Sequence, residues 1–208
     1  SKIFKLKRRS KNNPLIVHYH SLKMLMNDCY LNSNFFKLYK RFCPGPITFV
    51  LKLKKGSKIS KNVTNKKKTL AVRFPKHPIS RKLLKLLKYP LAAPSANIST
   101  KISAVTSQDV KDEFGKKLKY ILDGGASKVG LESTIVGLIN KPQILRLGGI
   151  EVKRINKILK TNLKYKSKNK TLIVPGQLKI HYSPGIPIRM NVNSPRLNEA
   201  FILIKKKK

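Results

Sequence analysis

The feature that most constrains the fold is a series of short apolar runs, mostly four to six residues long, between segments with helical spacing. Runs of this length suit the strands of a partly buried sheet, whereas apolar residues recurring every three or four positions indicate amphipathic helices. Their mixture along one chain predicts an α/β domain with a twisted mixed sheet and flanking helices. The expected strands cover residues 15–17, 47–53, 69–74, 91–93, 120–122, 133–139 and 143–147.

The expected helices lie between these strands and end at recognisable signals. The helix after Thr106 starts with a capping box in which Asp109 takes the place of Glu, and it stops at Gly115. The Pro-Gly-Pro run at 44–46 predicts a rigid turn, and the Lys-rich segment 54–68 predicts a loop. The expected helices cover residues 1–9 (the end of a helix), 21–31, 34–42, 78–88, 107–114 and 151–159.

Length and composition suit one globular domain with an appendage, since the chain has 208 residues of which 40% are hydrophobic. No run approaches the roughly 20 apolar residues of a membrane span, and no apolar signal segment follows the Lys-rich start. We therefore expect a cytoplasmic protein without a membrane partner. Cys29 and Cys43 form no C-x-x-C pair and no zinc-ligand spacing with the histidines, which predicts buried free thiols in a reducing compartment.

The net charge is +39, from 47 basic and 8 acidic side chains. Such a balance favours anionic partners such as nucleotide phosphates, RNA or acidic surfaces. The alternative is a compositional bias laid over an ordinary fold, because the cations are mostly Lys and because Asn and Ile are abundant as well. The scarcity of carboxylates leaves few candidates for a glycosidase-type carboxylate pair or a two-metal phosphatase site.

The stretch 90–106 (PLAAPSANISTKISAVT) is the first candidate site, because an apolar strand runs into small polar residues. Ligand sites of α/β proteins often lie at the carboxyl ends of strands. A strand followed by a Ser- and Asn-rich turn explains the same residues equally simply. No Walker loop, Rossmann fingerprint or nucleophile elbow occurs, so a bound nucleotide would depend on cations, hydroxyls and backbone amides.

Cations and hydroxyls at other strand ends are further candidates. Arg73 ends an apolar strand, where carboxylate binding and a structural ion pair are both reasonable roles, and Arg146 has a similar setting. The Lys7-x-Arg9 pair suits phosphate oxygens, but in so basic a chain the pair alone favours a solvated face. Ser133 follows Glu132 into a strand as a ligand-binding or simply buried hydroxyl. His77 could act as a base, or its side chain could cap a turn.

Six segments in order resemble one known family. They are KLKRRSKNNPLIVH, PGPITFVL, TLAVRFPKHP, PLAAPSANIST, ILDGGASKVGLESTIV and ILRLGGI. Together they closely resemble the threonylcarbamoyl-AMP synthases, which have a YrdC-like domain, from the first residues to about Ile150. PGQLKIHYSPGIP then resembles the linker of the longer, two-domain members. The family fold is a twisted α/β sheet around an open, positively lined cavity.

The resemblance implies a nucleotidyltransferase that combines L-threonine, bicarbonate and ATP into L-threonylcarbamoyladenylate and pyrophosphate. In this family, other proteins then transfer the threonylcarbamoyl group to the adenosine next to the anticodon of tRNA, so tRNA is a further expected partner. A Mg²⁺ ion is expected with ATP, held mainly by phosphate oxygens and water because carboxylates are few. Every reacting species is an anion, so cations and donors would supply proximity and charge stabilisation.

The matching motifs also imply roles for particular residues. Lys7, Arg9, Ser95 and Asn97 match the family's catalytic signature at the nucleotide, with Arg9 and Ser95 also in contact with ATP. The remaining expected ATP-binding residues are Asn13, Thr69, Ser103, Arg146 and Tyr182. The expected threonine-binding residues are His18, Arg73, Ala93 and Ser133, with Arg73 pairing with the threonine carboxylate. The resemblance implies no metal-ligating side chains.

The chain departs from the family pattern at several places. It lacks the PT-(D/E)-TVYGL segment that precedes the Lys-x-Arg motif, that motif reads KRRS where KGRP is usual, and Cys43 stands where Trp is usual. We therefore expect a YrdC-like domain without its first strand (1–160), a linker with the HYSP motif (161–188) and the start of a Rossmann-like domain (189–208). A chain cut at both ends in this way is expected to be weakly active or inactive.

Two alternatives to the synthase remain at this stage. The charge would suit a non-catalytic YrdC-like module that binds tRNA or other RNA, although the basic residues are spread along the chain and no RRM or KH signature occurs. A carbamoyltransferase of hydrogenase maturation contains a similar domain, but the HYSP linker is atypical of it.

Overall fold

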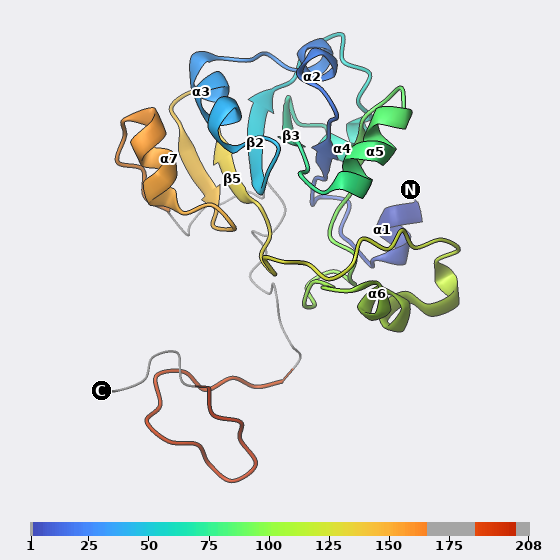
Figure 1. Ribbon diagram of the computed structural model, residues 1–208, viewed down its shortest axis with the longest axis vertical. Coiled ribbons are helices and arrows are strands. Elements are labelled where there is room, and N and C mark those ends of the chain that lie inside the picture. Colours follow the sequence, from blue (N-terminus) through green and yellow to red (C-terminus); the bar gives the residue numbers. More distant parts are fainter. Residues whose placement is uncertain (1, 166–185, 203–208) are drawn as a thin grey trace.

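The computed structural model of the protein describes residues 2–165 and 186–202 (Figure 1). Within these ranges a six-stranded mixed sheet has the order β4-β1-β3-β2-β5-β6, which confirms the predicted α/β fold. The strands are β1 (Ile16–His18), β2 (Ile47–Lys52), β3 (Thr69–Arg73), β4 (Leu91–Ala92), β5 (Thr134–Gly137) and β6 (Gln143–Arg146).

Two parallel pairs of strands are joined through one antiparallel pair. β1 is parallel to β3 and β2 is parallel to β5, whereas β2 and β3 are antiparallel. β4 and β6 lie at the edges as antiparallel partners of β1 and β5. One end of the sheet therefore collects the ends of β1, β3 and β6 together with the starts of β2 and β5. We call it the Arg73 end, after the last residue of β3.

One face of the sheet is covered by α2 (Leu22–Asp28), α3 (Ser33–Phe42) and α7 (Val152–Leu159), as Figure 1 shows. Leu25, Phe35 and Ile155 of these helices are fully buried with Phe49 and Val72 of the sheet. The apolar residues of each helix recur at helical spacing and form one stripe, so burial of that stripe against the strands builds the main core.

The opposite face of the sheet carries a smaller buried cluster, formed by Ile16, Val50, Ala71, Ile135 and Leu145. Side chains alternate between the two faces along a strand. The residues two positions nearer the Arg73 end on β1, β2 and β3 therefore share this face: they are His18, Thr48 and Arg73. Polar side chains thus replace the apolar cluster where the sheet reaches its Arg73 end.

Five further helical segments complete the described part of the chain. They are α1 (Lys2–Leu6), α4 (Lys61–Thr64), α5 (Pro78–Leu86), α6 (Ser107–Phe114) and the 3₁₀ turn η1 (Gly115–Lys117). The predicted capping box of α6 is confirmed: the Thr106 side chain accepts from the Asp109 amide, and the Asp109 side chain accepts from the Thr106 amide.

Two predicted elements are wrong. Residues 120–122 form no strand, since Tyr120 and Leu122 are 79% and 65% exposed and pair with none of the described strands. The predicted loop 54–68 contains the short helix α4, which starts at an N-cap where the Ser60 side chain accepts from the Asn62 amide. In the first helix Phe4 is buried, but Ile3 and Leu6 are only half-buried.

The predicted division into domains stays a prediction. The described core ends with α7, close to the predicted boundary at residue 160. Residues 186–202 contain no helix or strand, and within them Arg189 forms an ion pair of 2.6 Å with Glu199. Most of the predicted linker, including Tyr182, lies outside the described residues.

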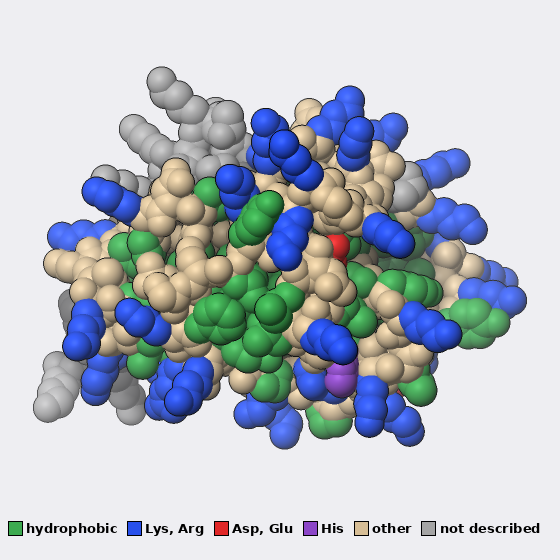
Figure 2. Space-filling model, turned by 90° about the horizontal axis from the view of Figure 1, so that it is seen from above, with side chains coloured by type: hydrophobic (Ala, Val, Ile, Leu, Met, Phe, Trp, Pro, Cys, Tyr) green, Lys and Arg blue, Asp and Glu red, His purple; other side chains and the backbone are tan. Residues whose placement is uncertain are grey.

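Cys29 and Cys43 are free thiols, as predicted, but only Cys29 is buried as expected, whereas Cys43 is half-buried. In the described part of the chain, no helix is both long and apolar enough to cross a membrane, and the cytoplasmic location stays a prediction. Figure 2 shows Lys and Arg side chains spread over the face seen from above, around an apolar patch. Asp28, the only acidic residue in positions 1–108, is buried and accepts hydrogen bonds from Tyr19 and Ser57.

Two adjacent phenylalanines offer a matched test of this packing. We expect Phe35→Ala to lower the free energy of unfolding by about 3–5 kcal/mol, because its buried ring packs against Phe36, Tyr39 and Phe49. The neighbouring Phe36 is 43% exposed, so Phe36→Ala should lower it by much less. Urea unfolding measures both values, and equal losses would contradict the assigned core.

Candidate functional site

A cavity of about 290 Å³ opens at the Arg73 end of the sheet. The topology explains its position, because the registers pair Arg73 with both His18 and Thr48, and Arg146 with Ile135. Strand ends that meet at one edge bring distant parts of the chain together. The lining residues with polar side chains are Arg9, His18, Arg73, Ser95, Ser103, Ser127, Glu132, Ser133 and Arg146.

Backbone carbonyls accept hydrogen bonds from all three guanidinium groups in this lining, and Arg146 donates to Ser133 O. Arg9 donates from Nε to Asn13 O at 3.2 Å and from Nη2 to Pro14 O at 2.8 Å. Arg73 donates from Nε to Gly45 O at 3.2 Å, and its terminal nitrogens have no hydrogen-bond partner among the described residues. The edge of Arg73 that suits a carboxylate is therefore open.

Burial and mutual repulsion make this cluster of cations an anion receptor. Burial lowers the pKa of Arg9 to about 10. The pKa of Arg73 is lowered by burial first and by the charge of Arg146 second, while Glu132 acts in the opposite direction. Cations that repel one another in a partly desolvated cavity are stabilised when an anion enters. The arrangement can therefore bind carboxylate or phosphate groups.

His18 is the neutral base of the cavity. Its Nε2 lies 3.1 Å from Ala93 O, and since a carbonyl only accepts, Nε2 carries the proton and Nδ1 is left as an acceptor. Burial and the neighbouring Arg73 lower the pKa of His18 to about 4. Near neutral pH the ring can thus accept a hydrogen bond from a ligand without adding another positive charge.

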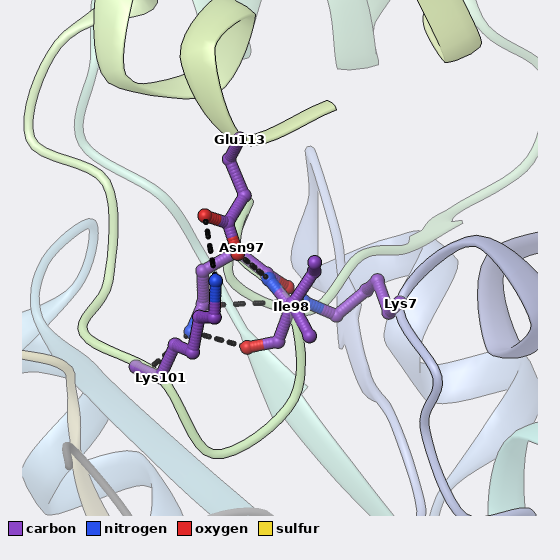
Figure 3. A network of polar contacts seen from close by, with 5 residues as sticks. All are labelled: Lys7, Asn97, Ile98, Lys101 and Glu113. Atoms are coloured by element: carbon purple, nitrogen blue, oxygen red, sulfur yellow. Dashed lines mark hydrogen bonds and ion pairs between the residues drawn. The ribbon is translucent and has the colours of Figure 1, made fainter. Parts of the chain in front are cut away.

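Lys7 and Asn97 lie behind the wall of the cavity rather than in its lining. The Lys7 ammonium donates to Ser95 O at 2.5 Å and to Asn97 O, and Figure 3 shows it pointing towards Asn97. Lys7 is only 5% exposed, so the solvated-face explanation of this residue is wrong. Burial, followed by the charge of Arg9, lowers the pKa of Lys7 to about 8. The expected catalytic role of Lys7 and Asn97 stays a prediction.

The same network connects α6 to the polar loop formed by residues 95–101. The connecting residue is Glu113, which the motifs did not indicate. Glu113 accepts from the Ile98 amide at 3.0 Å and pairs with Lys101 at 3.5 Å, while the Asn97 amide group donates to Lys101 O at 2.7 Å (Figure 3). The sequence offered only weak evidence for this contact, namely that Glu113 lies on the side of α6 that carries its apolar residues. The result is a loop held from two sides, with Ser95 facing the cavity.

The other expected residues divide between the cavity and its surroundings. Ala93, Ser95, Ser103 and Ser133 line the cavity, and Ser103 donates to Glu132 at 2.5 Å. Thr69, at the start of β3, is outside the lining.

Asn13 also lies outside the lining, but its environment is unusual. It is buried, and its Oδ1 has no hydrogen-bond partner among the described residues. A buried acceptor without a donor is rare, so this oxygen is available to accept a hydrogen bond from a ligand. At the start of α5 the His77 side chain makes no bond that caps this helix, and its Nε2 donates to Gly124 O in a turn at 3.1 Å; both roles expected for His77 stay predictions.

A pair of buried hydroxyls completes the site: Ser133 lines the cavity, and Thr48 lies outside its lining. Ser133 Oγ lies 2.7 Å from Thr48 Oγ1, and Arg146 donates from Nη2 to both Ser133 O and Ser133 Oγ, at 2.8 and 3.1 Å. Gly148 is needed beside them, because a Cβ there would lie 2.4 Å from Glu132 O. No residue pattern singled out Thr48, since its position in an apolar strand is equally typical of an ordinary buried Thr.

Comparisons with known proteins agree over most of the chain. Residues 1–148 match a sequence model of the family Sua5_yciO_yrdC, described as "Telomere recombination". The threonylcarbamoyl-AMP synthase of Pyrococcus abyssi is 36% identical over 94% of this chain and 58% of its own length. The enzyme of the same name from Schizosaccharomyces pombe is 36% identical over 92% of this chain and 55% of its own.

A solved structure adds the same comparison in three dimensions. The crystal structure of Pyrococcus abyssi Sua5 complexed with L-threonine has a TM-score of 0.82 and 35% identity, over 88% of this chain and 55% of that one. The chain thus spans a little over half the length of the relatives that it matches.

The environment of His18 predicts an unusual titration. We expect its imidazole to titrate near pH 4, because burial and Arg73 disfavour the charged ring. The folded pKa lies below the ordinary value of 6.5, so this term stabilises the fold above pH 6.5 and is lost as the pH falls towards 4. An NMR titration, with the signal assigned through its loss in His18→Gln, measures the pKa. A value between 6 and 7 would contradict this environment.

The buried ammonium of Lys7 predicts a local change in dynamics. Lys7→Met keeps the length of the side chain but leaves the carbonyls of Ser95 and Asn97 without this donor. We expect faster hydrogen exchange at the amides of residues 97–101, measured by mass spectrometry. Lys5→Met on the exposed side of α1 is the matched control and should leave exchange unchanged. Equal exchange in both variants would show that Lys7 does not hold the loop.

Proposed function

Since this chain belongs to the family of Sua5, YciO and YrdC, we propose that the protein is a threonylcarbamoyl-AMP synthase. It would combine L-threonine, bicarbonate and ATP into L-threonylcarbamoyladenylate and pyrophosphate, as a nucleotidyltransferase. Relatives with that name match more than nine-tenths of the chain at 36% identity. The complex of the Pyrococcus protein with L-threonine supports the same substrate here.

The observation that carries the proposal is the convergence of Arg9, Arg73 and Arg146 on one cavity whose lining contains a single carboxylate, Glu132. The reaction brings together a carboxylate, a bicarbonate and a triphosphate, which repel one another in water. Cations fixed in advance reduce this repulsion and hold the reactants in place. No covalent intermediate on the protein is required.

The proposed reaction has two steps. The neutral amine of threonine attacks the carbon of bicarbonate and forms a carbamate, and the hydrogen lost from nitrogen leaves in the released water. A carbamate oxygen then attacks the α-phosphorus of ATP, and pyrophosphate leaves. Arg73 would bind the threonine carboxylate through its open edge, while Arg9 and the Ser95 hydroxyl would face the phosphates. Nδ1 of His18 would accept a hydrogen bond from the amino acid.

Arg146 and Ser103 are proposed on the nucleotide side, with Ala93 and Ser133 on the threonine side. Asn13 and Thr69 are proposed further from the reacting atoms. The unpartnered Oδ1 of Asn13 supports a ligand donor nearby, such as a ribose hydroxyl or the adenine amine. Tyr182 lies outside the described residues, and its contact with ATP stays a prediction.

We propose that Mg²⁺ accompanies ATP. Among the residues that the structure describes, no group of three or more His, Cys, Asp or Glu side chains could hold a metal ion. Glu132 is the one carboxylate of the lining, so the site suits an ion whose other ligands are phosphate oxygens and water. Bound in that way, Mg²⁺ would neutralise charge on the departing pyrophosphate.

The partners of the product are proposed from the same family membership. Proteins that transfer a threonylcarbamoyl group to tRNA would consume the adenylate, which is a reactive mixed anhydride. tRNA itself is a further candidate because of the charge of the chain. A non-catalytic RNA-binding module is less well supported, because the cations on the face of Figure 2 are dispersed rather than gathered in one stripe.

Arg73 offers the most direct test of the proposed chemistry. In the complete protein, Arg73→Ala should abolish threonine-dependent pyrophosphate release, through a loss of about 2–5 kcal/mol in threonine binding. ATP binding should persist, because Arg9 and Ser95 remain. Arg41→Ala, on the exposed side of α3, is the matched control and should retain activity.

The outcome separates the candidate functions. Full activity in Arg73→Ala would refute the role of Arg73. A wild-type protein that binds RNA with a steep salt dependence but releases no pyrophosphate would favour the RNA-binding module instead.

A further inference from the structure

Thr48 is a hydroxyl in an otherwise apolar strand. It is the second residue of β2, is fully buried, and lies between Ile47 and Phe49, which are also fully buried. A buried hydroxyl is unfavourable unless it is hydrogen-bonded, and Val would fill the same volume without that requirement. Thr48 Oγ1 has one partner among the described residues, Ser133 Oγ at 2.7 Å. Thr48 itself does not line the cavity.

The direction of this hydrogen bond follows from the available acceptors. If Ser133 donated to Thr48, the hydroxyl hydrogen of Thr48 would be buried without any acceptor, which is costly. If Thr48 donates to Ser133, the Thr48 hydrogen has an acceptor, and the hydrogen left without a partner is that of Ser133, which lines the cavity. Ser133 Oγ then accepts from Thr48 and from Arg146 Nη2, which lies 3.1 Å away. Two accepted bonds use both lone pairs of the serine oxygen.

Ser133 Oγ has one hydrogen-bonding position left, which is its own O–H donor. Ser133 lines the cavity, so its hydroxyl becomes a donor to a bound molecule. The strand register sets Thr48 opposite Arg73, whose terminal nitrogens are unpartnered among the described residues. A fixed O–H donor and an open guanidinium edge at one corner suit a group that only accepts, such as a carboxylate.

We infer that Thr48 is a positioning residue that directs the Ser133 hydroxyl proton to the carboxylate of the amino-acid substrate. The inference rests on the proposed function and deepens it, because it assigns the carboxylate to the corner formed by Arg73 and Ser133. It also gives Arg146 a second role, which is to hold Ser133 in place: its guanidinium donates to Ser133 O from Nε and from Nη2.

The test is a double-mutant cycle in the complete protein. Thr48→Val keeps the shape of the side chain and removes the donor to Ser133. We expect a three- to tenfold rise in the KM for threonine, about the loss of one ordinary hydrogen bond, with the KM for ATP unchanged. In the Ser133→Ala background, Thr48→Val should have no further effect, because the residue through which it acts is absent.

Controls separate positioning from a structural effect. Thr48→Ser retains the hydroxyl and should restore the wild-type KM for threonine. 1-Aminopropan-2-ol, which is threonine without its carboxyl group, should bind equally well to wild-type protein and to Thr48→Val in calorimetry. The inference would be overturned by a Thr48→Val protein whose threonine KM changes less than twofold. It would equally be overturned by the same loss in the Ser133→Ala background, by Thr48→Ser behaving like Thr48→Val, or by an equal loss for 1-aminopropan-2-ol.

This outcome is distinct from a failure of the proposed function. If the proposed function were wrong, the wild-type protein itself would neither bind threonine nor release pyrophosphate in its presence.

Discussion

The parallel pairing of β1 with β3 is the constraint on which the rest of the site depends. Its register sets His18 beside Arg73, and the antiparallel partner β2 then sets Thr48 on the other side of the same arginine. Side chains that alternate along each strand bring all three residues to one face. A shift of one residue in either register would turn Arg73 into the main core, so burial of Val72 and Phe49 also fixes the position of the site.

Backbone oxygens orient Arg9 and Arg73 in the cavity. Gly45 O orients Arg73, and the carbonyls of Asn13 and Pro14 orient Arg9. A carbonyl accepts a hydrogen bond but does not neutralise a charge, so the positive potential remains available to a ligand. Carboxylate partners would give a more stable empty site and a weaker anion receptor. This arrangement makes the scarcity of acidic residues useful at the site, whatever its origin in the rest of the chain.

Sequence patterns predicted the elements with strong periodicity and failed where context decides. The strands around Phe49 and Val72 and the capped helix after Thr106 follow from local residue order alone. The segment with Tyr120 and Leu122 has the composition of a strand, but no described strand pairs with it, and its apolar side chains stay exposed. In the same way, lysine is usually a surface residue. Lys7 is a buried donor only because the carbonyls of Ser95 and Asn97, from a distant loop, lie next to its ammonium group.

The sequence by itself determined the class of fold, the family and the residue types available for the chemistry, because these depend on periodicity and ordered motifs. It also indicated Arg73, His18 and Ser133 through those motifs. Only the tertiary structure decided the neutral state of His18, the donors around Ser133 and the contact of Glu113 with the polar loop. Each of these depends on distances between residues far apart in the chain, and hydrogen-bond direction and desolvation are set by such distances rather than by residue order.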